Sequence, residues 1–522
     1  MPIISLESPT RARLPDAWVV DGSTATALRD ALQYEDQRAV YEWQRLKEYQ
    51  RQDDYISSRM GAGRRHWFVE KYGRDELDRQ AEEAAKACSK SVLEISPTGW
   101  YIPAGLAPRI AEEFGGVIER RYQYPEYTEG SAKTWSQPGY APRGYQVEAE
   151  QKLVACSHGA VELPTGSGKS YVIASLCNRF SDLGCIILAP TLSIAEQLLV
   201  DLTARFGKNA VGQFFAGKKE SKGRRVVVAV SKSVTNLTEN APLYLDLAQR
   251  QVVIVDESHM IAADTLRAMM EGIFAQVPYR FFFSGTQIRG DGLDLVLEGI
   301  TGPVVQKVAF KDLVNEGYLS KPTFHQFLFP AKDDWETNDV MKMTRHHIYQ
   351  HQAIYAHAGD TVLKAVRKGW PVLVLIDEVA QFPFLLPHIL GVKIGFAHGG
   401  ISAKDVGEDA RLRHLPKEFH KSKPMELVAA FDRGDLEVLV GTSCIGIGTD
   451  LKTPRMIIDL VGGKAEAALR QRVGRGSRLA PGKSEFHYVD YGVYTIPVLA
   501  KHVAFRAKVF KQIYSAPKVV KY

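Results

Sequence analysis

Short apolar runs, separated by longer segments of mixed polarity, dominate the chain from Gly144 onwards. Continuous apolar runs of this length are typical of strands that are buried on both faces of a parallel sheet. The runs form two groups, and each group predicts one doubly wound α/β sheet, with a cleft between the two. The first group comprises residues 185–188, 225–230, 252–255 and 281–283, and the second comprises 372–376, 392–396, 438–440 and 456–459.

The N-terminal part of the chain has a different pattern. Residues 25–90 are rich in Ala, Glu, Gln, Arg and Tyr without strand-like alternation, which predicts helices. Proline, glycine and serine interrupt residues 121–143, so this stretch is the best linker candidate. We therefore predict a small, mainly helical α+β accessory domain over residues 1–135, a first α/β domain over 136–320 and a second over 321–522.

Composition narrows the class of protein. The chain of 522 residues is 45% hydrophobic and 24% charged, close to the average of globular proteins, which argues against wholesale disorder. No apolar stretch approaches the ~18 residues of a membrane span, and the N-terminus has no secretory-signal pattern. The five cysteines form no C-x-x-C pair, which argues against a zinc site or a disulfide framework. We expect a cytoplasmic protein without a membrane partner.

The distribution of charge favours a polyanionic partner. The net charge is +6, yet residues 1–135 hold 19 Lys and Arg against 22 Asp and Glu. The remaining residues hold 47 against 38, so the positive surplus lies in the two α/β blocks. A surplus of this size suits contact with nucleic acid, although it is also common on proteins that bind none.

A glycine-bearing loop is the strongest local signal. It follows an apolar run and precedes a helical segment, where backbone N–H groups and the helix dipole favour a polyphosphate. Lys169 is placed to reach the β- and γ-phosphates, and the hydroxyl of Ser170 to ligate Mg²⁺. Leu163 stands where the usual pattern has Gly or Ala. The loop predicts ATP binding by Pro164, Thr165, Gly166, Ser167, Gly168, Lys169 and Ser170.

Two acids end an apolar strand 87 residues after the lysine. Asp256 at the strand end suits the Mg²⁺ shell, and Glu257 suits a general base for the attacking water. Acids are also common at the start of helices, but the upstream loop makes a catalytic role the better interpretation.

A basic segment in the second block completes the predicted active site. Gln471 begins the sequence Gln-Arg-Val-Gly-Arg-Gly-Ser-Arg, in which Arg475 and Arg478 lie about one helical turn apart. If the two sheets face each other, both arginines can act as fingers on the γ-phosphate. A solvated basic face is the alternative for this segment alone.

Taken in order, these motifs resemble the core of the superfamily-two helicases over about residues 140–495. Arg143 and Gln146 resemble the R-x-Y-Q element, whose glutamine reads adenine in that family. The resemblance implies two RecA-like domains, and nucleic-acid contacts at Thr191, Ser231 and Thr442. Ser284-Gly285-Thr286 stands at the family's coupling motif. The segment Gly441–Asp450 resembles motif V, which adds Gly448 and Asp450 to the nucleotide contacts.

Within that superfamily, the motifs most resemble the DNA-directed group of XPB, RecG-like remodellers and UvsW helicases of T-even phages. The stretch Pro97–Ile110 resembles a helix entry in the small N-terminal domain of the UvsW type, so DNA binding is a candidate role for residues 1–135. The resemblance implies an ATP- and Mg²⁺-dependent helicase or translocase that remodels branched DNA in recombination, repair or replication, in a bacterial or phage-infected cytoplasm. The alternatives are a DEAH-like RNA helicase and a non-translocating, ATP-gated nucleic-acid clamp.

Overall fold

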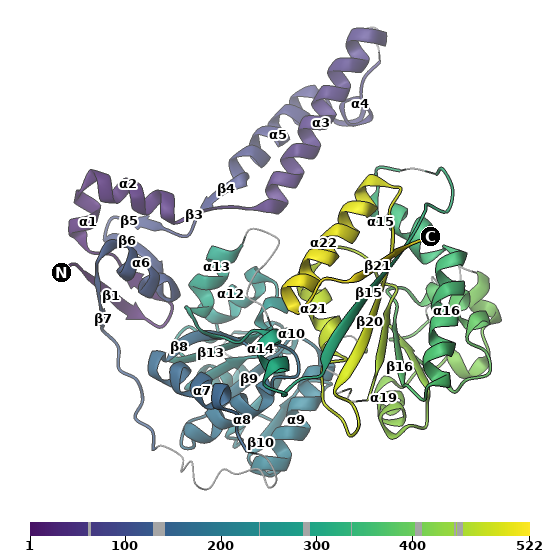
Figure 1. Cartoon of the computed structure of the whole chain (residues 1–522). Coiled ribbons are helices and arrows are strands. Elements are labelled where there is room, and N and C mark those ends of the chain that lie inside the picture. Colours follow the sequence, from purple (N-terminus) through teal and green to yellow (C-terminus); the bar gives the residue numbers. More distant parts are fainter. Residues whose placement is uncertain are drawn as a thin grey trace.

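Two seven-stranded parallel sheets and a smaller N-terminal sheet organise the molecule (Figure 1). The computed structural model describes residues 1–60, 64–128, 141–239, 241–285, 293–335, 337–401, 410–442, 445, 451 and 453–522. The predicted boundary at residues 135 and 136 lies outside the described residues. Within them, no helix combines the length and apolar character that crossing a membrane requires.

The first lobe contains a sheet in the order β10-β11-β9-β12-β13-β8-β14, in which every described pairing is parallel. One face packs on α7, α8 and α9, and the other on α10 to α13, with apolar cores on both faces. The strands are β8 (His158–Glu162), β9 (Cys185–Ala189), β10 (Val211–Phe214), β11 (Val226–Val230), β12 (Val252–Val255), β13 (Tyr279–Ser284) and β14 (Val304–Lys307). The helices are α7 (Gly144–Cys156), α8 (Lys169–Arg179), α9 (Leu192–Phe206), α10 (Ser231–Thr235), α11 (Pro242–Ala248), α12 (Ala263–Glu271) and α13 (Asp294–Thr301).

The second lobe repeats this architecture with the order β17-β18-β16-β19-β20-β15-β21, again parallel throughout. Its core also lies on both faces of the sheet. The strands are β15 (Lys321–Phe329), β16 (Val372–Leu375), β17 (Ile394–Ala397), β18 (Val438–Gly441), β19 (Met456–Asp459), β20 (Glu485–Val493) and β21 (Lys518–Lys521). The helices include α14 (Phe310–Asn315), α15 (Val340–Thr344), α16 (Gln352–Arg367), α17 (Phe382–Leu385), α19 (Pro424–Arg433), α21 (Glu466–Gly474) and α22 (Pro497–Ile513). The prediction of two tandem, doubly wound α/β domains is confirmed.

The N-terminal domain contains a five-stranded mixed sheet in the order β5-β6-β2-β1-β7. Trp100 is buried in its core, which makes it a packing residue. The strands are β1 (Ile3–Ser8), β2 (Arg11–Arg13), β5 (Glu94–Ser96), β6 (Gly99–Pro103) and β7 (Val117–Arg120), and the covering helices are α1 (Asp16–Val20), α2 (Gly22–Ala31) and α6 (Ala107–Phe114). A small, mainly helical α+β domain is therefore confirmed.

A helical hairpin extends from this domain, and we call residues 37–88 the arm. It begins and ends at the short ladder of β3 (Gln33–Glu35) and β4 (Ser89–Ser91). Its helices are α3 (Gln37–Met60), α4 (Trp67–Tyr72) and α5 (Arg74–Cys88), with a core of their own around Leu46, Phe68 and Leu77. Figure 1 shows the arm projecting away from the N-terminal sheet.

The N-terminal domain packs against α13 of the first lobe through a close backbone contact. A Cβ added at Gly105 would lie 2.5 Å from the carbonyl oxygen of Gly299 and 2.6 Å from that of Glu298. Arg109 reinforces the contact, because its guanidinium donates to the Glu298 carboxylate at 3.0 Å. Glycine at position 105 thus permits an approach that any side chain prevents.

We expect Gly105→Ala to loosen this contact and to destabilise the protein by about 1–3 kcal/mol, as overpacking does elsewhere. The measurement is thermal unfolding together with limited proteolysis of the segment after residue 120. Gly22→Ala is the matched control, since nothing lies within 4 Å of a Cβ at that position. Equal melting temperatures for the two variants would contradict the prediction.

Candidate active site

The phosphate loop joins the end of β8 to the start of α8. Gly166 and Gly168 have φ angles of +86° and +83°, a region that side-chain-bearing residues rarely adopt. Lys169 is the first residue of α8, so its ammonium lies beside the positive end of the helix dipole. The loop thus has the form that the sequence predicted, although which of its residues bind a nucleotide stays a prediction.

A buried ion pair connects this loop to the end of β12. The Lys169 Nζ atom lies 2.6 Å from Oε1 of Glu257, and both side chains are largely buried. Burial alone would raise the pKa of Glu257, but the Lys169 ammonium, with His259 and Arg475 nearby, holds that pKa below its usual value. Burial and the adjacent charge of Glu257 raise the pKa of Asp256 to about 7. The pKa values of the two neighbouring carboxyl groups are therefore shifted in opposite directions, and Glu257 is the one that bonds to the lysine.

Two features of this site fit an added phosphate, water or metal ion. Glu257 has a φ of +45°, a strained conformation that is concentrated at functional sites. Within the described structure, its Oε2 atom and the hydroxyl of Ser167 are buried without a hydrogen-bond partner. Groups of this kind are usually satisfied in proteins, so they fit a ligand that supplies donors and acceptors. Ser170 and Asp256 offer the oxygen ligands that Mg²⁺ prefers.

The second lobe touches the phosphate loop directly. A Cβ added at Gly474, at the end of α21, would lie 2.5 Å from the Cβ of Thr165. The hydroxyl of Ser477 donates to the Thr165 carbonyl at 3.4 Å. Ser477 also donates through its hydroxyl to the Gly474 carbonyl at 2.7 Å, which braces this turn. The two lobes therefore meet at the loop that the sequence predicted to hold phosphates.

The two predicted arginine fingers have different electrostatic surroundings. Burial lowers the pKa of Arg475 to about 10, and the carboxylate of Glu257 opposes that shift. Burial also lowers the pKa of Arg478 to about 10, but there Asp432 and Asp201 oppose it. The charge of Glu257 thus acts on Arg475, whereas one acid from each lobe acts on Arg478.

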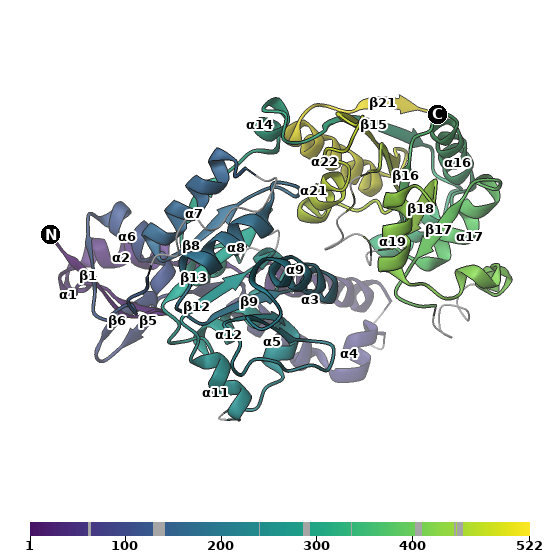
Figure 2. The ribbon, with the colours of Figure 1, turned by 90° about the horizontal axis from the view of Figure 1, so that it is seen from below.

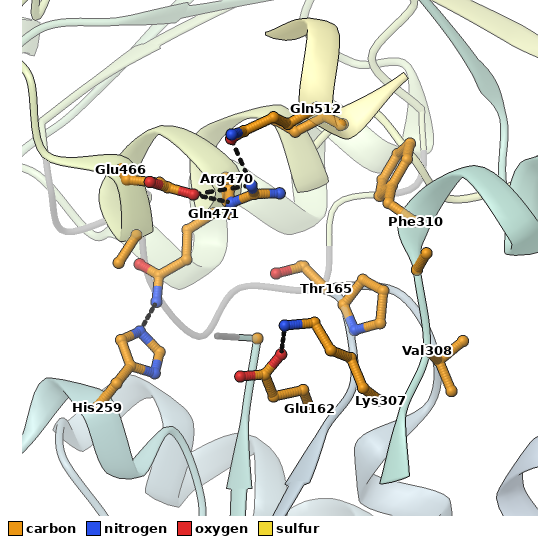
Figure 3. A pocket seen from close by; sticks show the side chains of 15 residues that line it. Glu162, Thr165, His259, Lys307, Val308, Phe310, Glu466, Arg470, Gln471 and Gln512 are labelled. Atoms are coloured by element: carbon orange, nitrogen blue, oxygen red, sulfur yellow. Dashed lines mark hydrogen bonds and ion pairs between the residues drawn. The ribbon is translucent and has the colours of Figure 1, made fainter. Parts of the chain in front are cut away.

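A histidine links the end of β13 to α21 across the two lobes. One ring nitrogen of His259, Nδ1, lies 2.7 Å from the hydroxyl of Ser284. The other, Nε2, lies 2.9 Å from the amide nitrogen of Gln471. Figure 3 shows the second of these contacts across the gap between the lobes. A change at the ion pair can thus reach the second lobe through a single side chain.

Gln146 braces the phosphate loop. Its side chain is fully buried, its amide donates to the Ser167 carbonyl at 2.8 Å, and its carbonyl oxygen accepts from the Arg143 backbone N–H at 3.0 Å. The hydroxyl of Tyr145 donates to the same Ser167 carbonyl at 2.6 Å. The Arg143 guanidinium stacks 4.7 Å from the ring centre of Tyr318. The predicted adenine contact stays a prediction, because both polar ends of the glutamine bond within the protein.

The predicted nucleic-acid contacts follow the carboxyl ends of three strands. Thr191 follows β9 and caps α9, accepting from the backbone N–H of Ile194. Ser231 follows β11 and Thr442 follows β18, and both side chains are largely buried. Carboxyl ends of parallel strands are where α/β folds bind their ligands. Thr286, Gly448 and Asp450 lie outside the described residues.

A cavity of about 200 Å³ lies between the two lobes, beside the start of the phosphate loop (Figure 3). Its floor includes an ion pair of 2.6 Å between Lys307 and Glu162, and its roof a second pair between Arg470 and Glu466. The amide oxygen of Gln512 accepts from Arg470. The walls come from both lobes, so the volume of this cavity depends on how far the lobes close.

A second group of metal-ligating side chains lies outside this cleft. Asp333, His346 and His347 offer ligand atoms within 4.8 Å of one another. Nε2 of His347 lies 2.7 Å from the Trp335 carbonyl, and Nδ1 accepts from the Lys332 N–H at 3.3 Å. Both nitrogens of His347 are therefore engaged by the backbone, which explains the group as local packing.

Sequence reasoning missed several residues that shape this site. Tyr145, Tyr318 and Ser477 contact the predicted site residues. Tyr145 stands inside the R-x-Y-Q element, but the sequence predicted no role for any of the three. Ser477 lies inside the basic segment of the second lobe, and its spacing from Gly474 was the available signal.

The family described as "Type III restriction enzyme, res subunit" matches residues 139–289, the part that contains the phosphate loop and both acids. Helicase 22 of the Sulfolobus islandicus filamentous virus is 22% identical over 67% of this chain and 63% of its own length. The DNA 3'-5' helicase XPB of Mycobacterium tuberculosis is 28% identical over 37% of this chain and 36% of its own. The chain thus spans less than two thirds of these relatives.

Solved structures share the fold. A fragment of an HsdR subunit of a type I restriction enzyme from Vibrio vulnificus aligns with a TM-score of 0.52, at 16% identity, over 73% of this chain and 69% of that one. A structure of T4 UvsW aligns over 100% of this chain and 99% of its own at 14% identity, with a TM-score of 0.41. The motifs, the two sheets and the sequence relatives together indicate a core that resembles those of the superfamily-two helicases, XPB among them.

The raised pKa of Asp256 predicts a pH dependence of stability in protein freed of metal by a chelator. In the unfolded chain this carboxyl has its ordinary pKa of 3.8, whereas in the folded chain burial and the charge of Glu257 raise the pKa to about 7. The stability that the protonated carboxyl contributes is thus complete below about pH 4 and is lost as the pH rises through 7. Asp256→Asn keeps the neutral form at every pH.

We therefore expect Asp256→Asn to have a larger free energy of unfolding than the unsubstituted chain at pH 8, by on the order of 2–4 kcal/mol, and a clearly smaller advantage at pH 5. Thermal unfolding at both values measures the difference. Asp264→Asn, an exposed acid at the start of α12, serves as the control. A gap that stays constant between pH 5 and pH 8 would show that burial does not shift Asp256.

Proposed function

We propose that this chain is an ATP-hydrolysing DNA helicase or translocase that remodels branched DNA in recombination, repair or replication. The observation that carries the proposal is the meeting of both lobes at the phosphate loop. Lys169 and Glu257 come from the first lobe, and Arg475 reaches the same buried site from the second. A site completed by two lobes makes hydrolysis depend on their closure.

Each side chain has a role that follows from its surroundings. Lys169 and the backbone N–H groups of the loop hold the polyphosphate of ATP, and Ser170 and Asp256 hold Mg²⁺, which neutralises phosphate charge. Glu257, ionised because of its lysine partner, accepts a proton from the attacking water. Arg475 faces the charge that develops on the transferred phosphate, and Arg478 is the second candidate finger, on which the charges of Asp201 and Asp432 act.

Movement along DNA follows from closure and release of the two lobes. Thr191 and Ser231 lie on the first lobe and Thr442 on the second, so closure shortens the distance between two sets of phosphate contacts. His259 joins Ser284 and Gln471, which couples the state of the nucleotide site to the position of the second lobe. Contacts to phosphate position the protein without reading sequence.

Two observations support DNA as the partner. The mycobacterial relative is named a DNA 3'-5' helicase, and the motifs of this chain resemble those of the DNA-directed group. The first test is the steady-state ATPase rate with forked DNA, four-way DNA, duplex DNA, single-stranded DNA and single-stranded RNA. We expect the largest stimulation with forked or four-way DNA. A preference for RNA would replace the proposal with an RNA helicase, and binding without any stimulation would replace it with a clamp.

Replacing the general base tests the chemistry. We expect Glu257→Gln to lower kcat by about 10²-fold or more, because the amide cannot accept the proton of water. DNA affinity should stay within about twofold, since Glu257 lies at the nucleotide site. ATPase rates and DNA anisotropy titrations measure the two effects. Full turnover in this variant would remove Glu257 from the role of base.

Replacing Arg475 tests the contribution of the second lobe. We expect Arg475→Ala to lower kcat by roughly 10³-fold while nucleotide binding persists, because its charge acts mainly on the transition state. Arg470→Ala on the same helix is the matched control, since its partners are Glu466 and Gln512. The two variants are compared by ATPase rate and by titration with a fluorescent nucleotide. A kcat equal to that of Arg470→Ala would show that the lobes do not share one nucleotide.

A further inference from the structure

The arm is an independently packed element that leaves the body of the molecule. Its longer helix, α3, has 24 residues, which corresponds to about 36 Å. In Figures 1 and 2 it runs from the N-terminal sheet towards the side of the second lobe and ends at α4. The arm has its own apolar core around Leu46, Phe68 and Leu77, so packing within the arm fixes the position of the tip.

The tip is a built structure around one buried carboxylate. The side chain of Asp53 is 0% exposed and accepts from Arg65 at 2.6 and 2.9 Å, from Arg74 at 3.1 Å and from the His66 backbone N–H at 2.9 Å. These hydrogen bonds from Arg65, with further support from Arg74, hold the pKa of Asp53 well below its usual range. The network joins α3, α4 and α5, so residues on α4 keep a defined orientation.

Charge is distributed unevenly along the arm. Residues 51–74, the tip, hold six Lys and Arg against three Asp and Glu. Two of those acids, Asp53 and Asp54, are already paired with arginines of the tip. Residues 37–50 and 75–88, the base, hold five against seven. The acidic average of the N-terminal domain therefore conceals a basic tip at its far end.

Aromatic side chains at the tip face solvent. Tyr55 is 60% exposed, Trp67 55% and Tyr72 51%, although aromatic residues usually bury most of their surface. The guanidinium of Arg59 lies over Tyr55, and the ammonium of Lys71 over Tyr72. Arg64, in the segment between α3 and α4, is also exposed. Exposed rings together with exposed cations are the combination that binds nucleic-acid bases and phosphates.

We propose that the arm tip is a second DNA-binding site, which engages the branch point of the DNA outside the interlobe cleft. Arg59, Arg64 and Lys71 contact phosphates, and Trp67 and Tyr72 stack on bases that are exposed where the duplex ends. This inference rests on the proposed function for its choice of polyanion. It adds a contact that the two lobes do not provide.

The test is DNA binding by the full chain with Arg64→Glu combined with Lys71→Glu, two exposed residues outside the Asp53 network. By fluorescence anisotropy we expect the Kd for forked DNA to rise about tenfold. The slope of log Kd against log salt should fall by about 2, because two phosphate contacts are lost. Lys47→Glu, an equally exposed lysine at the base of the arm, should change the Kd by less than twofold.

Trp67→Ala separates stacking from charge. We expect this substitution to weaken the binding of forked DNA more than that of blunt duplex DNA, because stacking needs an exposed base. The slope of log Kd against log salt should stay unchanged. Circular dichroism and the melting temperature establish that the arm is folded in each variant. The ATPase rate at saturating single-stranded DNA should equal that of the unsubstituted chain, since the tip lies outside the cleft.

The outcomes distinguish the two proposals. Unchanged affinity for every DNA in the charge-reversal variant overturns the arm proposal, whatever the ATPase rate. If the charge-reversal variant changes the oligomeric state, measured by size-exclusion chromatography with light scattering, while its DNA affinity stays the same, the arm proposal is also overturned. The tip is then a contact between protein chains. Absence of DNA-stimulated hydrolysis in the unsubstituted chain overturns the proposed function, while anisotropy still reports on the tip.

Discussion

The active site depends on placing two carboxyl groups at the buried end of one strand beside a single lysine. Ionising two buried, neighbouring carboxyl groups together costs free energy, and the ion pair of 2.6 Å with Lys169 favours the ionised form of Glu257. Lys169 begins the helix that follows β8, and the two acids follow β12, which lies two strands from β8 in the sheet. The ion pair between Lys169 and Glu257 therefore connects the phosphate loop to the end of β12. Parallel strand order is what makes this meeting possible, because both segments reach the same edge.

The second lobe adds a constraint of shape. Gly474 and Gly166 leave room for α21 and the phosphate loop to touch, and Ser477 bonds to the loop backbone. Arg475 directly follows α21, so it belongs to the segment that these small residues bring against the loop. The contact of His259 with Gln471 spans the same interface. The phosphate loop and the second lobe are therefore linked through a few direct contacts.

The N-terminal domain shows how an average can hide a local feature. Its overall excess of acids argues against contact with DNA, yet the acids gather at the base of the arm and inside the Asp53 network. Three basic residues and three aromatic residues of the tip remain exposed, namely Arg59, Arg64, Lys71, Tyr55, Trp67 and Tyr72. A close backbone contact at Gly105 fixes this domain on the first lobe. The direction of the arm is thus set relative to the cleft.

The sequence alone determined the two α/β sheets, because buried parallel strands are continuous apolar runs, and it determined the phosphate loop, because its glycines and lysine have a fixed spacing. It also predicted Glu257 of the first lobe as the general base and Arg475 and Arg478 of the second lobe as fingers on the γ-phosphate. Only the tertiary structure decided that Lys169 bonds to Glu257, that Gln146 turns towards Ser167, and that Arg475 and Arg478 have different surroundings. Those outcomes depend on burial and on distances between segments that lie far apart in the chain. The pattern of apolar and polar residues along the sequence contains no information on either.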